Sequence, residues 1–289
     1  MMAIEFVPYP PTSFPFRDLL VLEQLELRTD RQICEIGVGS GETTARLARV
    51  CAGVTGFDVS RPALEALAYL QRRHPNLRLI AADVTDAVAM GRHAEQYDGA
   101  FSCDTLEHVA DPAGFFRGIA TLLAPGGELA VTFPNEPLDR MHGVTRFDRP
   151  DELRAHLARA GLIDVRLGAA RLTPHAERIA RNLGWRPLAA ARRALAAGHA
   201  LARLGRRGGT SAGESELPPQ VFDETRFFRD RQLWRRLSPA VNLYWYGVLR
   251  LMAARGPSFV IDWGFGSTSF EHCQVFVTAR KPARLAAAA

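Results

Sequence analysis

Hydrophobic positions follow two different periods along the first two thirds of the chain. Short apolar runs bounded by turn residues are typical of buried strands, and longer stretches with apolar residues three or four apart are typical of helices. The strand-like runs are QICEIGV (32–38), VTGFDV (54–59), LRLIAAD (77–83), YDGAFSC (97–103) and GELAVTF (127–133). Helical stretches such as GETTARLARV, RPALEALAYLQRR and DPAGFFRGIATLL lie between them. This alternation predicts right-handed βαβ units and a doubly wound α/β fold.

The pattern extends a little further and then changes. DRPDELRAHLARAG and LIDVRLG add a helix and a strand, EHCQVFVTARK (271–281) has the pattern of a last strand, and RDLLVLEQLEL (17–27) predicts a helix ahead of the first. Between 169 and 269 the sequence shows no strand alternation, and helical patterns take its place. We therefore expect a mostly parallel, seven-stranded sheet built from 1–168 and closed by 270–289, with a helical insertion at 169–269.

The composition is that of an ordinary globular protein. The chain has 289 residues, 47% of them hydrophobic and 23% charged, which excludes a disordered chain, collagen and a coiled coil. The opening MMAIEFVPYPPTSFPF has no signal-peptide pattern, and the longest apolar stretch, 239–254, is too short to span a bilayer. The cysteines, Cys34, Cys51, Cys103 and Cys273, have no CxxC spacing. We therefore expect reduced thiols, no metal site and a cytoplasmic location.

Positive charge is concentrated in one segment. Between Arg166 and Arg207 the sequence has ten arginines and a single acid, Glu177, a local charge of +9, whereas the whole chain carries +5. Such a segment is either a solvated face in an arginine-biased chain or a surface for nucleic acid, anionic lipid or an acidic substrate. Lys281 is the only lysine, which argues against Schiff-base chemistry and against a phosphate-binding GK[ST] loop.

A glycine-rich turn joins the first predicted strand to the helix after it. Gly37, Gly39 and Gly41 fall in the segment EIGVGSGE, where glycines let a ligand approach the backbone and a helix N-terminus offers free N–H groups. Asp58 ends the second strand about 20 residues further on, where a carboxylate can accept both hydroxyls of a ribose. Together the turn and the acid predict a nucleoside cofactor.

Two acidic residues around the turn distinguish between nucleoside cofactors. A dinucleotide places its pyrophosphate at the helix N-terminus, and Glu42 would repel an anion there. Glu35, at the tip of the first strand, would instead suit a ligand with a cationic amino-acid tail. These acids favour S-adenosylmethionine over a nicotinamide dinucleotide, whose oxidoreductases are the rival within the same fold class.

Four segments resemble, in order, the motifs of class I S-adenosylmethionine-dependent methyltransferases. ICEIGVGSGETTARLA is similar to the first motif, GFDVS to the second and AADVTD to the third. FSCDTLEHVADP followed by LLAPGGELAVTFPN resembles the fourth strand and its sequel in the small-molecule branch that includes the quinone-biosynthesis methyltransferases. The resemblance covers residues 30 to 168, more weakly 270 to 280, and implies a Rossmann-like methyltransferase fold with S-adenosylmethionine as cofactor.

The resemblance also implies a set of cofactor contacts at the ends of the strands. Asp58 would bind the ribose hydroxyls, with Val59 and Ser60 beside the adenosine. Asp83 would meet the adenine amino group, and Val84 would pack on the ring. The other members of the set are Glu35, Gly37, Gly39, Gly41, Cys103 and Asp104. For the two that end the fourth strand, packing and turn capping are competing interpretations.

Two histidines are the candidate catalytic residues. Methyl transfer is an in-line displacement with a neutral leaving group, so alignment and a dry site supply most of the rate, but a hydroxyl acceptor also needs a base for its proton. His108 lies just past the fourth strand, and His142 lies in the loop MHGVTRFD after the fifth, which also contains Arg146 and the further candidate base Asp148. A helix turn at LEH and a plain surface loop are the competing interpretations.

The part of the chain that would bind the acceptor matches no motif. Eleven aromatic residues lie between Phe222 and Phe270. They form either the core of the helical insertion or the lining of an apolar pocket. We expect this insertion to bind a small-molecule or lipid-like acceptor, methylated at a hydroxyl oxygen in secondary metabolism.

Other functions are kept as alternatives. A quinone or lipid methyltransferase at a membrane surface is one, because residues 187–207 predict a basic, weakly amphipathic helix suited to peripheral membrane contact. A nucleoside-binding module without chemistry is another. A nucleic-acid substrate is disfavoured, because the fourth strand is followed by Cys103-Asp104-Thr105-Leu106 and not by [ND]PP[YFW]. The sequence predicts no particular oligomeric state.

Overall fold

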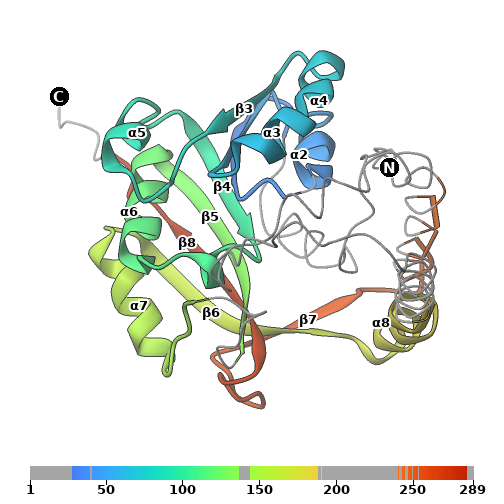
Figure 1. Ribbon diagram of the computed structural model, residues 1–289. Helices are drawn as coiled ribbons and strands as arrows, with labels where there is room; N and C mark the ends of the chain where they lie inside the picture. Colours follow the sequence, from blue (N-terminus) through green and yellow to red (C-terminus); the bar gives the residue numbers. More distant parts are fainter. Residues whose placement is uncertain are drawn as a thin grey trace, which may run out of the picture.

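The apolar runs of the sequence form one eight-stranded sheet in the computed structural model (Figure 1). The structure describes residues 28–39, 41–136, 144–187, 190, 240, 243–244, 247–248, 250–252 and 254–284. The strands are β1 (Gln32–Ile36), β2 (Gly53–Asp58), β3 (Leu77–Ala81), β4 (Tyr97–Cys103), β5 (Leu123–Asn135), β6 (Ile163–Leu172), β7 (Phe259–Trp263) and β8 (Cys273–Arg280).

The strand order is β3-β2-β1-β4-β5-β8-β6-β7. The pairs among the first five strands are parallel, whereas β8 is antiparallel to both β5 and β6. The predicted doubly wound, mostly parallel sheet is therefore confirmed, including the last strand that returns to close it. Because the chain order reverses beside β1, the ends of β1 and β4 form the switch point where open α/β sheets bind ligands.

The predicted number of seven strands is wrong by one. β7 pairs antiparallel with β6, from Gly168 with Trp263 to Leu172 with Phe259, and the two run together toward α8 (Pro174–Ile179) (Figure 1). Both ends of the predicted helical insertion at 169–269 thus contain strand. The sequence FVIDW is too short for its periodicity to distinguish a strand from a buried helix. Its pairing with β6 makes it a strand.

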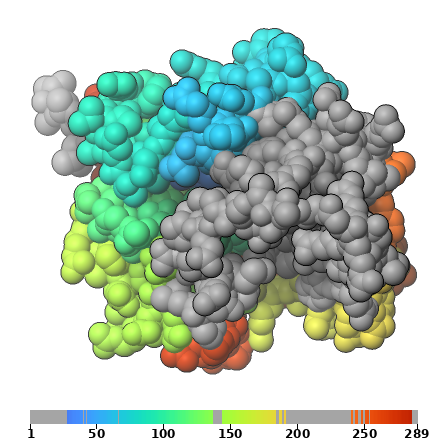
Figure 2. Space-filling view, in the orientation of Figure 1, coloured from blue at the N-terminus to red at the C-terminus, as the bar shows by residue number. Residues whose placement is uncertain are grey.

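Helices cover both faces of the sheet, as the apolar patterns on both sides of the strands require. The other helices are α2 (Glu42–Leu47), α3 (Arg61–Ala66), α4 (Ala68–Arg73), α5 (Ala87–Gly91), η1 (Leu106–His108), α6 (Pro112–Leu122), α7 (Pro150–Arg159) and the π-helical η2 (Ala180–Trp185). Figure 1 shows α2, α3 and α4 together at one part of the sheet and α5, α6 and α7 together at another. The same two groups form adjoining surfaces of the molecule in Figure 2.

Two apolar cores correspond to the two faces. Phe57, Phe115 and Phe116 belong to one cluster, together with Leu153 of α7. Ile33, Phe101 and Phe276 belong to the other cluster. Each of the nearby helices adds a buried leucine to it: Leu47 of α2, Leu64 of α3 and Leu70 of α4. Ile33 and Cys34, neighbours in β1, belong to opposite clusters, so this strand contributes to both layers.

Several predictions of the sequence concern residues that the structure does not describe. The helix expected at 17–27, most of the segment 187–207 and six of the eleven aromatic residues from Phe222 to Phe270 lie outside the described residues. The membrane-contact hypothesis for 187–207 therefore stays a prediction. Within the described part of the chain, no helix combines the length and apolarity that a transmembrane passage demands.

Candidate functional site

The turn between β1 and α2 has the backbone that only glycines adopt readily. Gly37, Gly39 and Gly41 have φ values of 82°, 53° and 73°, in the left-handed region. A Cβ on Gly37 would lie 2.0 Å from Oγ1 of Thr105. At Gly39, by contrast, no described heavy atom would lie within 4 Å of a Cβ, so this stretch of backbone has open space beside it. The turn is thus tightly packed at its start and accessible in its middle.

Asp58, at the end of β2, holds the glycine turn in place. Its Oδ2 accepts from the N–H of Val38 at 2.9 Å and from the N–H of Gly39 at 3.4 Å. Its Oδ1 accepts from the N–H of Ser60 at 2.9 Å, and Ser60 in turn caps α3 by accepting from the N–H of Ala63. A carboxylate offers about four acceptor positions. The Gly39 contact is longer than a normal hydrogen bond, so the two short backbone bonds leave about two positions for the hydroxyls of a ligand.

The residues predicted to contact the adenosine differ in how exposed they are. Val59 directly follows Asp58 and is 72% exposed, an apolar side chain next to the turn. Val84 is only 5% exposed and belongs to the core cluster packed against α6. Asp83 closes a local turn, because its Oδ1 accepts from both the N–H and the hydroxyl of Thr85 at 2.8 Å. Of the apolar pair, Val59 thus has the exposure that a ring contact needs.

Glu35 faces α2. It is 4% exposed, and it accepts a hydrogen bond from the hydroxyl of Thr44. Thr44 is itself fully buried in α2. The acid predicted to attract a cationic tail is therefore tied to the helix that follows the glycine turn. It contributes negative charge next to this turn, and it fixes the helix to the strand.

The residue that follows β4 also has a left-handed backbone. Asp104 has a φ of 50°, and its Oδ1 accepts from Nε2 of Gln274 at 2.9 Å. The next residue, Thr105, donates to the backbone O of Ile36 or of Cys103, at 3.3 and 3.2 Å. Cys103 is partly buried at the strand end. These contacts join the ends of β4 and β1 on either side of the glycine turn.

His108 is the histidine at the edge of the sheet where β1 and β4 end. It lies in η1, one turn beyond Thr105, and its side chain is 57% exposed. Burial lowers the pKa of His108, and the negative charge of Asp104 opposes this effect. An imidazole with a lowered pKa is mostly neutral at physiological pH and can take up a proton.

The segment after β5 passes beside η1. The N–H groups of Val144 and Thr145 donate to the backbone O of Glu107 at 2.7 and 2.9 Å, and the Thr145 hydroxyl donates to the O of Val109 at 2.6 Å. These bonds place the second half of the loop MHGVTRFD against the backbone on either side of His108. His142, the other candidate catalytic residue, lies outside the described residues.

Arg146 and Asp148 of the same loop form ion pairs. Arg146 lies 3.2 Å from Glu271 and 3.7 Å from Asp148, measured between guanidinium nitrogen and carboxylate oxygen. The side chain of Asp148 is 84% exposed. Asp148 therefore faces solvent more than it faces the site.

Three residues of this region were missed by the sequence analysis. Thr105 packs against Gly37, and Gln274 joins β8 to Asp104. Asn135, 1% exposed at the end of β5, exchanges hydrogen bonds with the backbone of Phe147 and donates to the O of Phe270. The FPN at a strand end was a weak signal for Asn135. No local pattern pointed to Gln274, because its partners are more than a hundred residues away in sequence.

Burial keeps three of the cysteine thiols in the protonated form. None of the four cysteines forms a disulfide. Burial raises the pKa of Cys34, Cys51 and Cys273, to about 11 for Cys273. A thiol with a raised pKa stays protonated at physiological pH, and the thiolate is the reactive form.

Comparison with known proteins agrees with this geometry. Residues 34–131 match a family model described as a methyltransferase domain. Among curated proteins, the ubiquinone biosynthesis O-methyltransferase of Stutzerimonas stutzeri is 30% identical over 176 residues, which cover 55% of this chain and 75% of that protein. The enzyme of the same name from Ralstonia nicotianae is 29% identical over 162 residues, 50% of this chain and 68% of the relative.

A solved structure supports the fold alone. The crystal structure of the [4+2]-cyclase SpnF aligns with a TM-score of 0.50 at 19% identity, over 92% of this chain and 80% of that chain. A cyclase catalyses a reaction other than methyl transfer, so the fold by itself does not decide the reaction.

The chain belongs to the class I S-adenosylmethionine-dependent methyltransferases, and its cofactor is S-adenosylmethionine. The residues at the switch point fit this cofactor. The glycine turn offers open backbone at Gly39, the carboxylate of Asp58 has spare acceptor positions, and Val59 exposes an apolar side chain beside them. The predicted fold class, cofactor and enzyme class are confirmed.

Proposed function

We propose that this methyltransferase acts on a hydroxyl oxygen of a small or lipid-like acceptor, with His108 as the base. The observation that carries the proposal is the half-exposed imidazole of His108, kept mostly neutral by burial, at the same strand ends as the glycine turn. A thioether acceptor would not require such a group, because it has no proton to lose. A hydroxyl does, because its proton must leave as the new bond forms.

The cofactor residues have separate roles in this proposal. Asp58 accepts the ribose hydroxyls while it keeps its bonds to Val38 and Ser60. The backbone of the glycine turn at 37–41 lies along the amino-acid part, where Glu35 supplies negative charge. Val59 covers the adenine ring. Val84 supports this region from the core, and Asp83 reaches the adenine amino group from its turn.

The proton transfer follows from the charges. When bound, S-adenosylmethionine supplies an electrophilic methyl group on a sulfonium, and the bond from that carbon breaks with its electron pair left on the sulfur. His108 takes the proton of the acceptor hydroxyl as the oxygen bonds to the methyl carbon. The positive charge thus ends on the imidazolium, and the acidic groups around His108 stabilise it.

The names of the relatives suggest the chemistry of the acceptor. Both are O-methyltransferases of ubiquinone biosynthesis, which favours an aromatic hydroxyl on a ring that carries an apolar tail. The aromatic-rich stretch that begins at Phe222 offers suitable side chains for such a ring. Delivery of this acceptor at a membrane surface, through the basic residues at 187–207, is the alternative within the proposal.

A pair of matched acceptors tests the methylated atom. The protein is incubated with S-adenosylmethionine and either an alkyl-substituted catechol or the aniline with the same alkyl group, and products are identified by mass spectrometry. We expect a methyl ether from the catechol and no methylated aniline. His108→Gln should reduce the rate at neutral pH by about 100-fold or more, the usual contribution of a positioned base.

The outcome that contradicts the proposal is equally direct. Methylation of the aniline in preference to the catechol would show an amine acceptor. A His108→Gln variant that methylates the catechol at the wild-type rate would exclude His108 as the base. S-Adenosylhomocysteine binding by calorimetry serves as the control, since His108→Gln should leave it unchanged.

A further inference from the structure

A chain of hydrogen bonds joins the last strand to the segment that carries His108. Gln274, on β8, donates from Nε2 to Oδ1 of Asp104 at 2.9 Å and to Oγ1 of Thr132 at 2.8 Å. Thr132, on β5, donates its hydroxyl proton to the backbone O of Val275 at 2.9 Å. The network thus links the ends of three strands that are adjacent in the sheet, β4, β5 and β8.

These partners determine which way the amide of Gln274 points. The carbonyl of Val275 can only accept, so Thr132 donates to it and is left to accept from Gln274. An ionised Asp104 also only accepts. Both protons of the Gln274 amide group are therefore in use, and the assignment of nitrogen and oxygen follows from the network itself.

Asp104 is held through its backbone as well as its side chain. Its φ of 50° is uncommon for a residue with a Cβ, although aspartate adopts it more readily than most. Its N–H donates to the backbone O of Thr132 at 2.9 Å. β5 thus fixes the main chain of Asp104, and β8 fixes its carboxylate.

The fixed carboxylate acts on His108. The N–H of His108 donates to the backbone O of Thr105 at 2.9 Å, so a single helical turn separates His108 from Asp104. Across this turn, the charge of Asp104 raises the pKa of the imidazole against the larger, opposite effect of burial. Glu107 is a second carboxylate nearby, with its Oε1 at 3.8 Å from Nε2 of His108. On the neighbouring loop the charged Arg146 is paired with Glu271 and Asp148.

We infer that Gln274 is a positioning residue of the methyl-transfer site, which holds the Asp104 carboxylate where it stabilises the protonated imidazole of His108. The inference rests on the proposed role of His108 as the base for the acceptor hydroxyl. As His108 takes that proton, its ring becomes a cation, and a carboxylate already in place favours this charge without rearrangement. Gln274 acts on His108 through Asp104 in this arrangement.

Titration of the imidazole by nuclear magnetic resonance tests the inference without acceptor or cofactor. The signal of His108 is assigned by its loss in His108→Gln. Asp104→Asn removes the carboxylate charge and should lower the pKa of His108 by up to about 1. Gln274→Leu releases the carboxylate and should lower it by less, about 0.3 or more.

The double variant separates a positioning role from a direct one. In the Asp104→Asn background, Gln274→Leu should cause no further shift, because the carboxylate through which it acts is gone. A shift of equal size in both backgrounds, or an unchanged pKa of His108 in Gln274→Leu alone, would overturn the inference.

Two further variants control for altered packing. Gln96→Leu removes a glutamine that donates to the backbone O of Arg92, and it should leave the titration of His108 unchanged. Thr132→Val keeps the shape of its side chain but removes the hydroxyl that orients Gln274. It should lower the pKa of His108 in the same direction, and it replaces Gln274→Leu if that variant fails to fold. Thr132→Val without such a shift would count against the network.

Kinetics distinguish this inference from the proposed function. If the catechol is methylated, Gln274→Leu should move the acid limb of the kcat profile to lower pH and reduce its plateau by about 2-fold or more, with KM little changed. If no hydroxyl acceptor is methylated but the titration shifts are found, the proposed function is overturned, whereas the positioning of His108 through Asp104 stands.

Discussion

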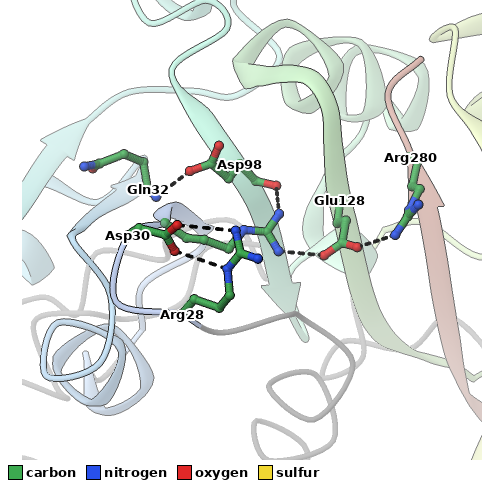
Figure 3. Close-up of polar contacts among 7 residues, drawn as sticks. Arg28, Asp30, Gln32, Asp98, Glu128 and Arg280 are labelled. Atoms are coloured by element: carbon green, nitrogen blue, oxygen red, sulfur yellow. Dashed lines mark hydrogen bonds and ion pairs between the residues drawn. The ribbon is translucent and has the colours of Figure 1, made fainter. Parts of the chain in front are cut away.

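The two ends of the sheet use charged residues in different ways. Where the strands begin, Arg31 and Arg280 bind the two oxygens of Glu128 at 2.9 and 2.7 Å, and Asp98 accepts from the N–H of Gln32 at 2.7 Å (Figure 3). Where the strands end, Asp58 and Asp104 accept from neutral amides. Glu128 therefore lies against two cations at one end of the sheet, whereas Asp58 and Asp104 face dipoles at the other.

This difference separates stabilisation from function. An ion pair cancels charge, and when partly buried it loses much stability if one partner is removed. Neutral donors orient a carboxylate but leave its negative charge effective. The carboxylates at the ends of β2 and β4 therefore keep both charge and a fixed direction, as a binding site for hydroxyls and cationic groups requires. The following predictions test the contrast, from the largest expected effect to the smallest.

Two glycines with the same backbone conformation provide the strongest test. Gly37→Ala should weaken S-adenosylhomocysteine binding by about 100-fold or more, since left-handed strain of about 1 to 2 kcal/mol adds to a clash with Thr105 that must displace the turn. The Cβ would lie 2.0 Å from Oγ1 of Thr105. Calorimetric titration measures the affinity.

Gly126→Ala is the matched control. Gly126 has a φ of 81°, close to the 82° of Gly37, but no described atom lies within 4 Å of its Cβ position, and it lies at the beginning of β5. It should cost about 1 to 2 kcal/mol of stability from strain alone and leave binding unchanged. Equal loss of affinity in both variants would contradict the distinction between the two ends.

Glu128→Ala should have the next largest effect, on stability and not on binding. The side chains of Arg31 and Glu128 are 10% and 16% exposed, so the change leaves a poorly hydrated guanidinium without this carboxylate. We expect a loss of about 2 kcal/mol in the free energy of unfolding, between the values for surface and buried pairs. Chemical denaturation measures it. Weakened S-adenosylhomocysteine binding with unchanged stability would contradict the assignment of Glu128 to stability.

Asp58→Ala should weaken S-adenosylhomocysteine binding about tenfold or more, from the loss of charge-assisted hydrogen bonds. Asp98→Ala is its counterpart at the other end, because Asp98 also accepts from a strand N–H, that of Gln32. It should reduce stability by about 1 kcal/mol and leave the affinity as it is. Unchanged affinity in Asp58→Ala would remove the ribose role from this residue.

The smallest effect concerns acid stability at Glu95. Hydrogen bonds and charge from Lys281, together with Arg284, lower the pKa of Glu95 below its usual value. A lowered folded-state pKa stabilises the protein above the unfolded pKa of about 4.3, and this stabilisation is lost as the pH falls through the folded value. The melting temperature of wild type should thus slightly exceed that of Glu95→Gln at pH 7, and the two should converge in acid. Added salt should also reduce the difference, because the pairs are exposed.

Much of the fold was predictable because its signals are local. The runs around β1, β2 and β4 are short, apolar and followed by glycine or acid, and these features alone indicated strands and ligand-binding ends. β7 was missed, since its five residues, four of them apolar, acquire their strand conformation from pairing with β6. The single long helix predicted for RPALEALAYLQRR is divided at Leu67, which ends α3 and begins α4.

The candidate site shows the same division. Gly37, Gly39, Gly41 and Asp58 were predicted from a motif whose chemistry depends on neighbours in sequence, and the structure finds the strained backbone and the acid side by side. Val84 was expected to face a ligand, and it lies in the core because α6 packs on it. A sequence motif indicates which residues lie near a strand end. Which of them stay exposed depends on the packing of helices such as α6 on the sheet.

The sequence by itself determined the class of fold, the nucleoside cofactor and the edge of the sheet at which it binds, because each depends on periodicity or on residues within one turn of a strand end. Only the tertiary structure decided that Gln274 reaches Asp104, that Thr105 closes against Gly37 and that one end of the sheet pairs its charges. These contacts join residues far apart in the chain. They exist only after β8 has returned antiparallel between β5 and β6, and no local pattern specifies the partner across a strand.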